Sequence, residues 1–365
     1  MIAKIVTILA FLCCSVSLQA QDSIKYRILF IGDAGEINST QKTIIQQAAA
    51  LSIPGKTSAV YLGDNIYPRG MGLPGSAEEN STKEILQSQY LPMRARNTPV
   101  YFVPGNHDWD RSGPLGLAKI KAQSDFLQLQ NDSGLHAAPA NGCPDPVAIP
   151  LTPMLTLIAW DSEWWLYPYA KDTGTEGCTC KTQKDVVAKL ELLRDNNRGK
   201  IILLASHHPF KSYGEHAGHF TLKDHLFPLT AINGKLLIPL PVLGSLYPVL
   251  RNIFPLAEDL KNPVYQNMIR EVSGVFKDFP NIAYIAGHEH GLQLIKNERL
   301  QIVSGAGAKH TNAKRGKGSL FADATQGFVT ADLLANNQLR FSFFIAVKDS
   351  VRLAYSYEMP KTATR

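Results

Sequence analysis

The sequence predicts an α/β (α+β) protein in which two packed, mixed β-sheets are flanked by helices. Six short, β-rich apolar runs recur along the chain, with helical patterns between them, whereas the C-terminal part has strand patterns without helices. Near-continuous apolar runs are typical of strands buried on both faces. Strands that alternate with helices indicate βαβ units and a largely parallel sheet, and the strand-only tail predicts an antiparallel or mixed second sheet.

The six apolar runs share one design, because each stops at a small residue that polar groups follow. This pattern places polar side chains where each predicted strand ends. The runs are YRILFIGDAG (26–35), SAVYLGDNIY (58–67), PVYFVPGNHDW (99–109), LTLIAWDSEWW (155–165), KIILLASHHPF (200–210) and NIAYIAGHEHG (281–291).

Helices are predicted where apolar residues recur at a spacing near 3.6. The first of these segments opens on Ser39 and Thr40, which are typical N-cap residues. The helical segments are 39–52, 182–197 and 262–279, and the strand patterns of the tail are 300–308, 327–334, 339–347 and 351–359.

The composition is that of a compact globular protein. Of the 365 residues, 45% are hydrophobic and 19% are charged, which excludes a disordered chain. The formal net charge of +6 is modest for this length. The densest basic stretch, KRGKG at 314–318, is short, so we expect no nucleic-acid partner.

The N-terminal segment 1–20 has the pattern of a secretory signal peptide. One lysine precedes an apolar stretch of about ten residues, and small and polar residues end at Ala20. The apolar stretch is too short to cross a membrane comfortably. We therefore expect a secreted or periplasmic protein, with residues 21–365 forming a single domain.

Export implies an oxidising compartment, which bears on the three cysteines that remain after cleavage. Cys178 and Cys180 are too close in sequence for an easy mutual bridge, so we expect Cys143 to pair with one of them. Zinc binding by the three cysteines is the alternative, disfavoured because no fourth ligand stands at a finger-like spacing.

An apolar insertion near 230–256 contains an uncharged stretch, LLIPLPVLGSLYPVL (236–250). Its three prolines and one glycine argue against a helix that spans a bilayer. Two interpretations remain open: an insertion packed on the body, or an apolar flap or membrane-contacting loop near the active site.

Side chains of metal-binding types stand at the ends of five of the six apolar runs. In open α/β sheets, ligands bind outside the carboxyl ends of the strands, so we expect these side chains to converge. If the chain stays extended after the sixth run, residues two apart in its H-x-H motif point to the same side. The residues are Asp33, Asp64, Asn106 with His107, His207 with His208, and His288 with His290.

This set of side chains suits a site for two metal ions. Carboxylates, an amide oxygen and neutral imidazoles can hold both ions, with one aspartate as a bridge. Two ions about 3.5–4 Å apart clamp a phosphate, lower the pKa of a bound water and stabilise the leaving oxygen. A histidine that binds no metal can contact the phosphate or protonate the leaving group.

The motifs GDAG, GDNIY, GNHD, SHHP and GHEH, in this order, resemble those of the calcineurin-like metallophosphoesterases. From Lys25 to the C-terminus, the chain more closely resembles the small, tartrate-resistant purple acid phosphatases. Tyr67 carries this closer resemblance, because the purple enzymes have at this position a tyrosinate bound to ferric iron. The resemblance implies the four-layer metallophosphoesterase sandwich.

The resemblance also implies a binuclear centre of Fe(III) and a divalent iron, zinc or manganese ion. His107 would face the phosphate, with Asp108 orienting its ring, and His216 would be a candidate acid or phosphate contact. His208 stands where the family has a tyrosine. The Fe(III) ligands would be Asp33, bridging Asp64, Tyr67 and His290, and the divalent ion would be held by Asp64, Asn106, His207 and His288.

The function implied is that of a secreted acid phosphatase, in which a hydroxide bound to the metals attacks a phosphate monoester. A phosphodiesterase or nucleotidase of the same superfamily is the first alternative. A protein that binds metal and phosphate without turnover is the second, and His107 with His216 argues against it. We expect a small phosphorylated substrate, no transmembrane span and a monomer.

Overall fold

The computed structural model describes residues 23–171, 177–220, 226–227, 238–240 and 243–360. The predicted signal peptide lies outside the described residues, as do positions 230–237 and 241–242 of the apolar insertion.

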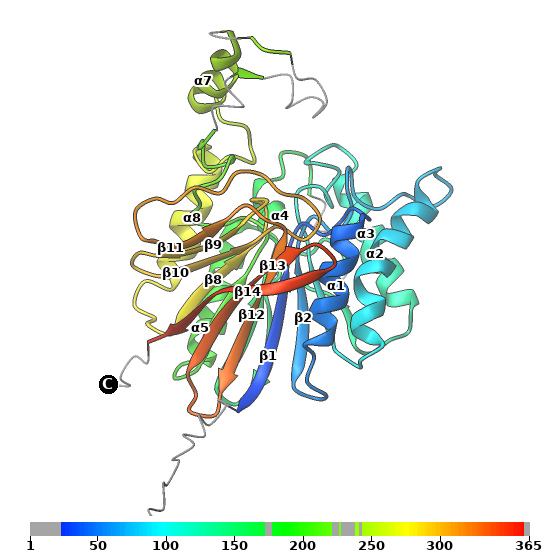
Figure 1. Ribbon diagram of the computed structural model, residues 1–365. Helices are drawn as coiled ribbons and strands as arrows, with labels where there is room; N and C mark the ends of the chain where they lie inside the picture. The colour runs from blue at the N-terminus through cyan, green and yellow to red at the C-terminus, as the bar shows by residue number, and fades with distance from the viewer. Residues whose placement is uncertain (1–22, 172–176, 221–225, 228–237, 241–242, 361–365) are drawn as a thin grey trace, which may run out of the picture.

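Two seven-stranded sheets pack face to face and helices cover both outer faces (Figure 1). The strand order of one sheet is β14-β13-β12-β1-β2-β3-β4, and that of the other is β11-β9-β10-β8-β7-β6-β5. The strands are β1 (Ile24–Ile31), β2 (Thr57–Leu62), β3 (Val100–Val103), β4 (Leu135–Ala137), β5 (Val147–Thr152), β6 (Leu155–Ala159), β7 (Ile201–Ala205), β8 (Ile282–Ala286), β9 (Leu292–Lys296), β10 (Leu300–Ser304), β11 (Ser319–Asp323), β12 (Gly327–Leu334), β13 (Leu339–Val347) and β14 (Ser350–Met359).

The predicted fold class is confirmed, and all six apolar runs form strands. The runs divide between the sheets: β1, β2 and β3 pair in parallel in one, and β6, β7 and β8 in the other. β2, β6 and β8 are buried at every residue, as expected for strands covered on both faces.

The tail strands do not form a second sheet of their own, and this part of the expectation is wrong. β10 pairs in parallel with β8, whereas β12 pairs antiparallel with β1 and continues through β13 to β14. The first sheet is parallel from β1 to its edge strand β4 and has antiparallel strands on one side only, whereas the second has a parallel centre with antiparallel strands on both sides. The central strand ends of both sheets point toward one end of the molecule.

Three clusters of buried apolar side chains join the layers. The central cluster fills the space between the sheets, with Phe30 and Leu62 from one sheet against Leu203 and Ile285 from the other. The other two clusters lie beneath the helices on the two outer faces. The helices are α1 (Ser39–Ala50), α2 (Glu79–Arg94), α3 (Gly116–Leu129), α4 (Ser162–Leu166), α5 (Gln183–Asn196), α7 (Leu246–Ile253) and α8 (Pro263–Val275).

The helix starts follow local side-chain chemistry. The N-cap of α1 is Asn38, whose side chain accepts from the Gln41 N–H, so the cap precedes the predicted Ser39–Thr40 by one residue. At α5, Thr182 and Asp185 form a reciprocal capping box.

The predicted disulfide is present and joins Cys143 to Cys178, while Cys180 is a buried free thiol. Because two of the three cysteines are bonded to each other, the zinc alternative is excluded.

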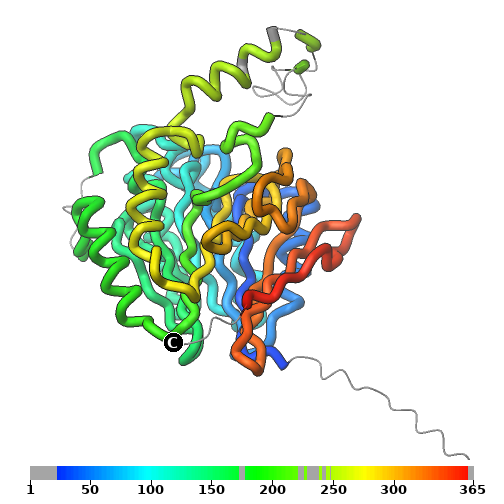
Figure 2. The backbone as a smooth tube through the Cα atoms, turned by 90° about the vertical axis from the view of Figure 1, so that its left-hand side faces the viewer, coloured from blue at the N-terminus to red at the C-terminus, as the bar shows by residue number. Residues whose placement is uncertain are grey.

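The described part of the apolar insertion includes α7, which projects from the body beyond the ends of the central strands (Figures 1 and 2). Within the residues that the structure describes, no helix combines the length and apolarity needed to cross a bilayer.

Candidate metal centre

Glycines bring the strand ends close enough for their side chains to meet. A Cβ on Gly63 would lie 2.5 Å from the His207 ring, and Gly63 also has a φ of +85°. A Cβ on Gly287 would lie 2.7 Å from the Asp33 carboxylate. Gly63 and Gly287, which precede Asp64 and His288, thus let one strand end approach the side chain carried by another.

Three of the predicted ligands adopt left-handed backbone conformations, with φ of +57° at Asp33, +53° at Asp64 and +68° at His288. The extended backbone considered for His288 and His290 is therefore wrong. The chain bends at His288, and the two rings serve different parts of the site instead of one common point.

Asp33, Tyr67 and His290 form the first group of side chains. The Tyr67 hydroxyl donates to Asp33 Oδ1 at 3.0 Å and lies 3.1 Å from His290 Nε2, which is itself 3.4 Å from Asp33 Oδ1. Lys309 Nζ lies 3.3 Å from the centroid of the Tyr67 ring. A carboxylate, a phenol and an imidazole are thus held around one point.

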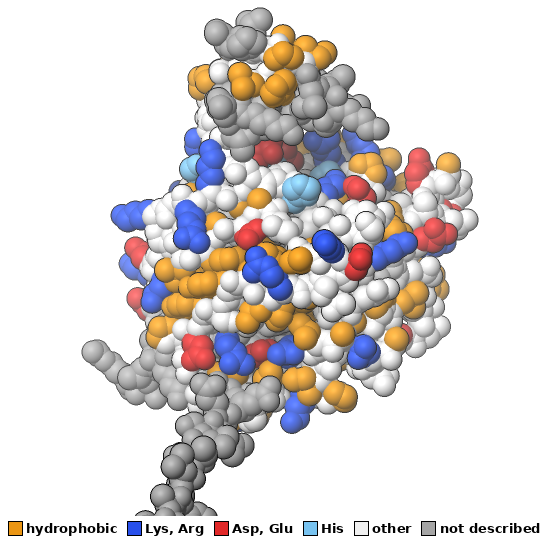
Figure 3. Space-filling view, in the orientation of Figure 1, with side chains coloured by type: hydrophobic (Ala, Val, Ile, Leu, Met, Phe, Trp, Pro, Cys, Tyr) orange, Lys and Arg blue, Asp and Glu red, His pale blue; other side chains and the backbone are white. Residues whose placement is uncertain are grey.

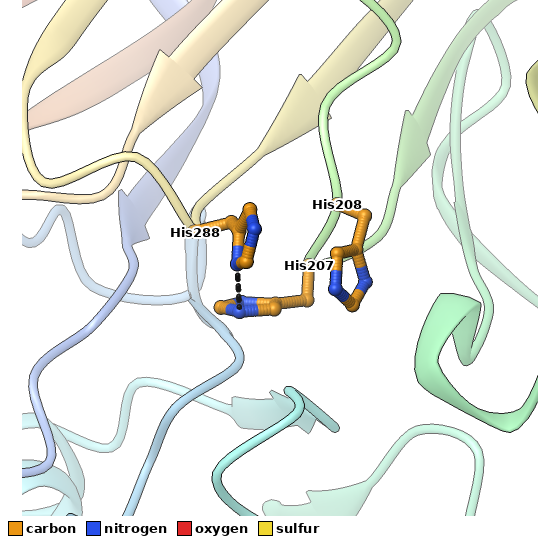
Figure 4. A group of neighbouring side chains, drawn as sticks. All are labelled: His207, His208 and His288. Atoms are coloured by element: carbon orange, nitrogen blue, oxygen red, sulfur yellow. Dashed lines mark hydrogen bonds between the residues drawn. The ribbon is translucent and has the colours of Figure 1, made fainter. Parts of the chain in front are cut away.

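The second group joins Asn106 to His207 and His288, the two rings in contact in Figure 4. His207 Nδ1 donates to the Leu62 carbonyl at 2.8 Å, and His288 Nε2 donates to the Glu258 carbonyl at 2.8 Å. When both rings are neutral, the other nitrogens carry lone pairs. These two nitrogens, His207 Nε2 and His288 Nδ1, lie 3.2 Å apart, and Asn106 Oδ1 is 3.0 Å from His207 Nε2.

Asp64 lies between the two groups. Its Oδ1 accepts from the His107 backbone N–H at 2.9 Å and lies 3.4 Å from His207 Nε2. Asp33, Asp64 and His207 each present a ligand atom within 4.8 Å of the others. Lone pairs this close repel one another unless a cation lies among them, so the donors fit a metal centre.

Burial sets the charge of these groups in the absence of a cation. Burial and the neighbouring Asp64 raise the pKa of Asp33 to about 7, against the opposing effect of His207. Burial lowers the pKa of His290 to about 4 and that of His288 well below its usual value. A bound cation favours ionised carboxylates and neutral imidazoles, which is the state that metal ligation requires.

His107 reaches the site from the loop after β3. Its Nδ1 donates to the Pro68 carbonyl at 2.6 Å, which leaves Nε2 on the side of Asp64 Oδ2, at 3.8 Å. The expectation that Asp108 orients this ring is wrong. The Asp108 carboxylate accepts instead from the backbone N–H groups of Asn65, Ile66 and Gly105.

Asp108 therefore stabilises the GDNIY loop, and its loss is expected to destabilise the fold. In Asp108→Ala, three buried N–H groups lose their acceptor, and the free energy of unfolding should fall by about 3 kcal/mol or more. Urea denaturation checks this value. Asp323→Ala, at a half-buried position at the end of β11, is the control and should change it by less than about 1 kcal/mol.

His216 packs over the second group, with its ring centroid 4.1 Å from that of His288. Its Nδ1 lies 3.4 Å from Asp259 Oδ1 and 3.1 Å from Arg251 Nη2. Burial lowers the pKa of His216, but the hydrogen bond to Asp259 and the nearby carboxylates outweigh burial and raise it to about 9.

His208 lies behind the site and is fully buried. Its Nδ1 pairs with Ser162 Oγ at 2.9 Å, and its ring packs against those of His288 and Tyr265. Figure 4 shows the ring beside the contact between His207 and His288. Of the two neighbouring histidines, His207 is therefore the one whose ring contacts Asn106 and His288.

Sequence reasoning missed the charged residues that the insertion brings to the site. A cavity of about 430 Å³ is lined by Asp64, Asn106, His107 and both histidines of the GHEH motif, together with Arg251 and Glu258. Arg251 is the first charged residue after the fifteen uncharged residues 236–250. Its position at the end of this stretch was the sequence feature that could have indicated a role at the site. The backbone of Glu258 fixes the tautomer of His288.

Comparison with known proteins assigns the chain to a family. The family model of the calcineurin-like phosphoesterases matches residues 26–234, more than half of the chain. The chain belongs to the calcineurin-like phosphoesterases. Members of this family are metal-dependent hydrolases of phosphate esters that typically hold two metal ions. No curated protein sequence matches this calcineurin-like phosphoesterase.

Solved structures share the fold at low sequence identity. GAP50, the anchor in the inner membrane complex of Plasmodium, is 16% identical with a TM-score of 0.52, and the match covers 94% of this chain and 91% of GAP50. The purple acid phosphatase PPD1 of yellow lupin (Lupinus luteus) is 13% identical with a TM-score of 0.52, over 93% of this chain and 54% of the lupin chain. PhoD is 12% identical with a TM-score of 0.54, over 92% of this chain and 70% of PhoD. At these identities the likeness shows the fold alone.

Proposed function

We propose that this calcineurin-like phosphoesterase is a secreted or periplasmic acid phosphatase that hydrolyses small phosphate monoesters at a binuclear metal centre. The observation that carries the proposal is the convergence of three candidate ligand atoms. His207 Nε2 lies 3.0 Å from Asn106 Oδ1 and 3.2 Å from His288 Nδ1. Their lone pairs need a cation. The neighbouring group of Asp33, Tyr67 and His290 offers a second set of ligands.

Two cations would supply electrophilic stabilisation of the phosphate and a lowered pKa for bound water. The trivalent ion proposed for the first group suits the phenol oxygen of Tyr67 and the carboxylate of Asp33, which are hard oxygen ligands. Asp64 lies between the groups and is the proposed bridge. The divalent ion, as iron, zinc or manganese, would be held by Asp64, Asn106, His207 and His288.

His107 and His216 are the proposed catalytic residues. The Pro68 carbonyl holds His107 Nδ1, so Nε2 is directed toward Asp64 and the cavity, where a phosphate oxygen would lie. The Asp259 carboxylate accepts from Nδ1 of the protonated His216 ring, so Nε2 is the nitrogen that can donate to the leaving oxygen of a bound ester.

The first experiment is metal analysis and visible spectroscopy of the mature chain, with hydrolysis of p-nitrophenyl phosphate at pH 5 and pH 9. We expect iron, a visible charge-transfer band from Tyr67, and faster hydrolysis at pH 5. The matched substrate bis(p-nitrophenyl) phosphate should be cleaved more slowly. Tyr67→Phe should lose the band, because the phenol oxygen is its source.

Other outcomes of the same experiment identify the alternatives. Faster cleavage of the diester would indicate a phosphodiesterase. A colourless protein with two zinc or manganese ions and activity would keep the phosphatase and remove the role of Tyr67. A metal-loaded protein without hydrolysis would indicate a binding role.

A further inference from the structure

Helix α7 has its apolar face turned away from the protein. Leu246, Val249, Leu250 and Ile253 stand at positions i, i+3, i+4 and i+7, which is one face of an α-helix. These side chains and the following Phe254 are between 43% and 71% exposed. A surface helix ordinarily buries this face against its own core, so the reversed orientation requires an explanation.

Polar contacts hold the opposite face of the helix against the body. Arg251 is bonded to Glu215, at 2.9 Å, and to Asp259, at 2.8 Å, and its side chain is only 8% exposed. The Asn252 side chain accepts from Lys261 Nζ. These buried ion pairs fix the rotation of α7, so the apolar face is directed outward by the structure.

A group of cations surrounds the base of the helix. Arg251 stacks over the Phe220 ring, and the Phe220 carbonyl accepts from Lys314 Nζ at 2.7 Å. The acids that face this region from α7 and its flanking loops, which are Glu215, Glu258 and Asp259, are all within ion-pair distance of Arg251. The exposed basic residues of this collar are Lys211, Lys261 and Lys314.

The same cations act together on one neighbouring side chain. Burial lowers the pKa of His219, and Lys314, Lys261 and Lys211 lower it further. Three cations from three different segments therefore lie close to one ring. Figure 3 shows hydrophobic side chains gathered at the tip of the molecule, with lysine and arginine side chains below them.

We propose that α7 docks this protein on an anionic phospholipid surface. The apolar side chains would enter the interface between head groups and acyl chains, and the basic collar would contact the head-group phosphates. Leu256, which follows α7, lines the cavity of the metal centre, so docking would place that cavity close to the membrane. The proposal concerns attachment and does not depend on turnover.

Vesicle co-sedimentation of the mature chain, residues 21–365, tests the proposal. We expect binding to vesicles of phosphatidylcholine with phosphatidylglycerol, and weaker binding to phosphatidylcholine alone. The double variant Ile253→Ser/Phe254→Ser should lower the affinity by at least about tenfold. The control Leu129→Ser/Leu192→Ser removes two equally exposed apolar side chains on α3 and α5 and should bind as the wild type does.

A charge variant and two further readouts complete the test. Lys211→Glu/Lys314→Glu should weaken binding to the anionic vesicles only, and added salt should have the same effect. Wild-type protein that fails to bind, or an α7 variant that binds normally, would overturn the proposal. A dimer that depends on concentration and is lost in the α7 variant would overturn it in favour of a second copy of the chain. Hydrolysis of p-nitrophenyl phosphate without vesicles reports separately on the phosphatase.

Discussion

Replacing Asp64 with alanine is expected to lower the rate of phosphate ester hydrolysis by about a thousandfold or more. Among the residues that the structure describes, Asp64 is the carboxylate that lies between the two groups of candidate ligands. Its Oδ1 is 3.4 Å from His207 Nε2, and it also accepts from the His107 backbone N–H. Its loss removes a ligand from both sites and a constraint on the loop that carries His107.

Metal analysis measures this effect directly, because Asp64→Ala should retain less than one metal ion per chain. Asp64→Asn keeps the shape and removes the charge, so it should show an intermediate loss. The control is Asp132→Ala, which breaks the 2.7 Å ion pair with Arg94 far from the cavity and should leave metal content and rate unchanged. Full metal content and a normal rate in Asp64→Ala would reject the proposed bridge.

The sequence was sufficient to predict that the candidate ligands lie together, because these residues follow uninterrupted apolar runs. A run such as AVYL at 59–62 indicates a strand buried on both faces, which it is, and places the polar residue after it at the carboxyl end of that strand. The parallel pairing of β1 with β2 and of β7 with β8 then brings Asp33, Asp64, His207 and His288 to one end of the molecule.

Other features depend on contacts that a local pattern does not contain. β12 and β10 have similar strand patterns, yet one joins β1 and the other joins β8, because register and packing between sheets decide the partner. Likewise, the carbonyl of Glu258 fixes the tautomer of His288 from thirty residues away. The rotation of α7 depends on ion pairs of Arg251 with residues on both sides of it in sequence.

Replacing His107 with alanine is expected to lower kcat by about a hundredfold or more while the metal content stays unchanged. The prediction follows from the position of the ring, which lines the cavity but lies outside the two groups of candidate ligands. His107 Nδ1 is bound by the Pro68 carbonyl, so only Nε2 can contact a phosphate. A protein that binds metal and phosphate without hydrolysing an ester would not need a histidine in this position.

His136→Ala is the matched control, since His136 lies on β4 and stacks on Tyr101 at 5.0 Å, away from the cavity. It should leave kcat, KM and metal content unchanged. His216→Ala, measured in parallel, should also lower kcat with metals retained, because its ring covers His288 without belonging to the proposed ligand set. If His107→Ala loses metal together with activity, His107 supports the metal centre instead of contacting the substrate, and His216 becomes the remaining candidate for proton transfer.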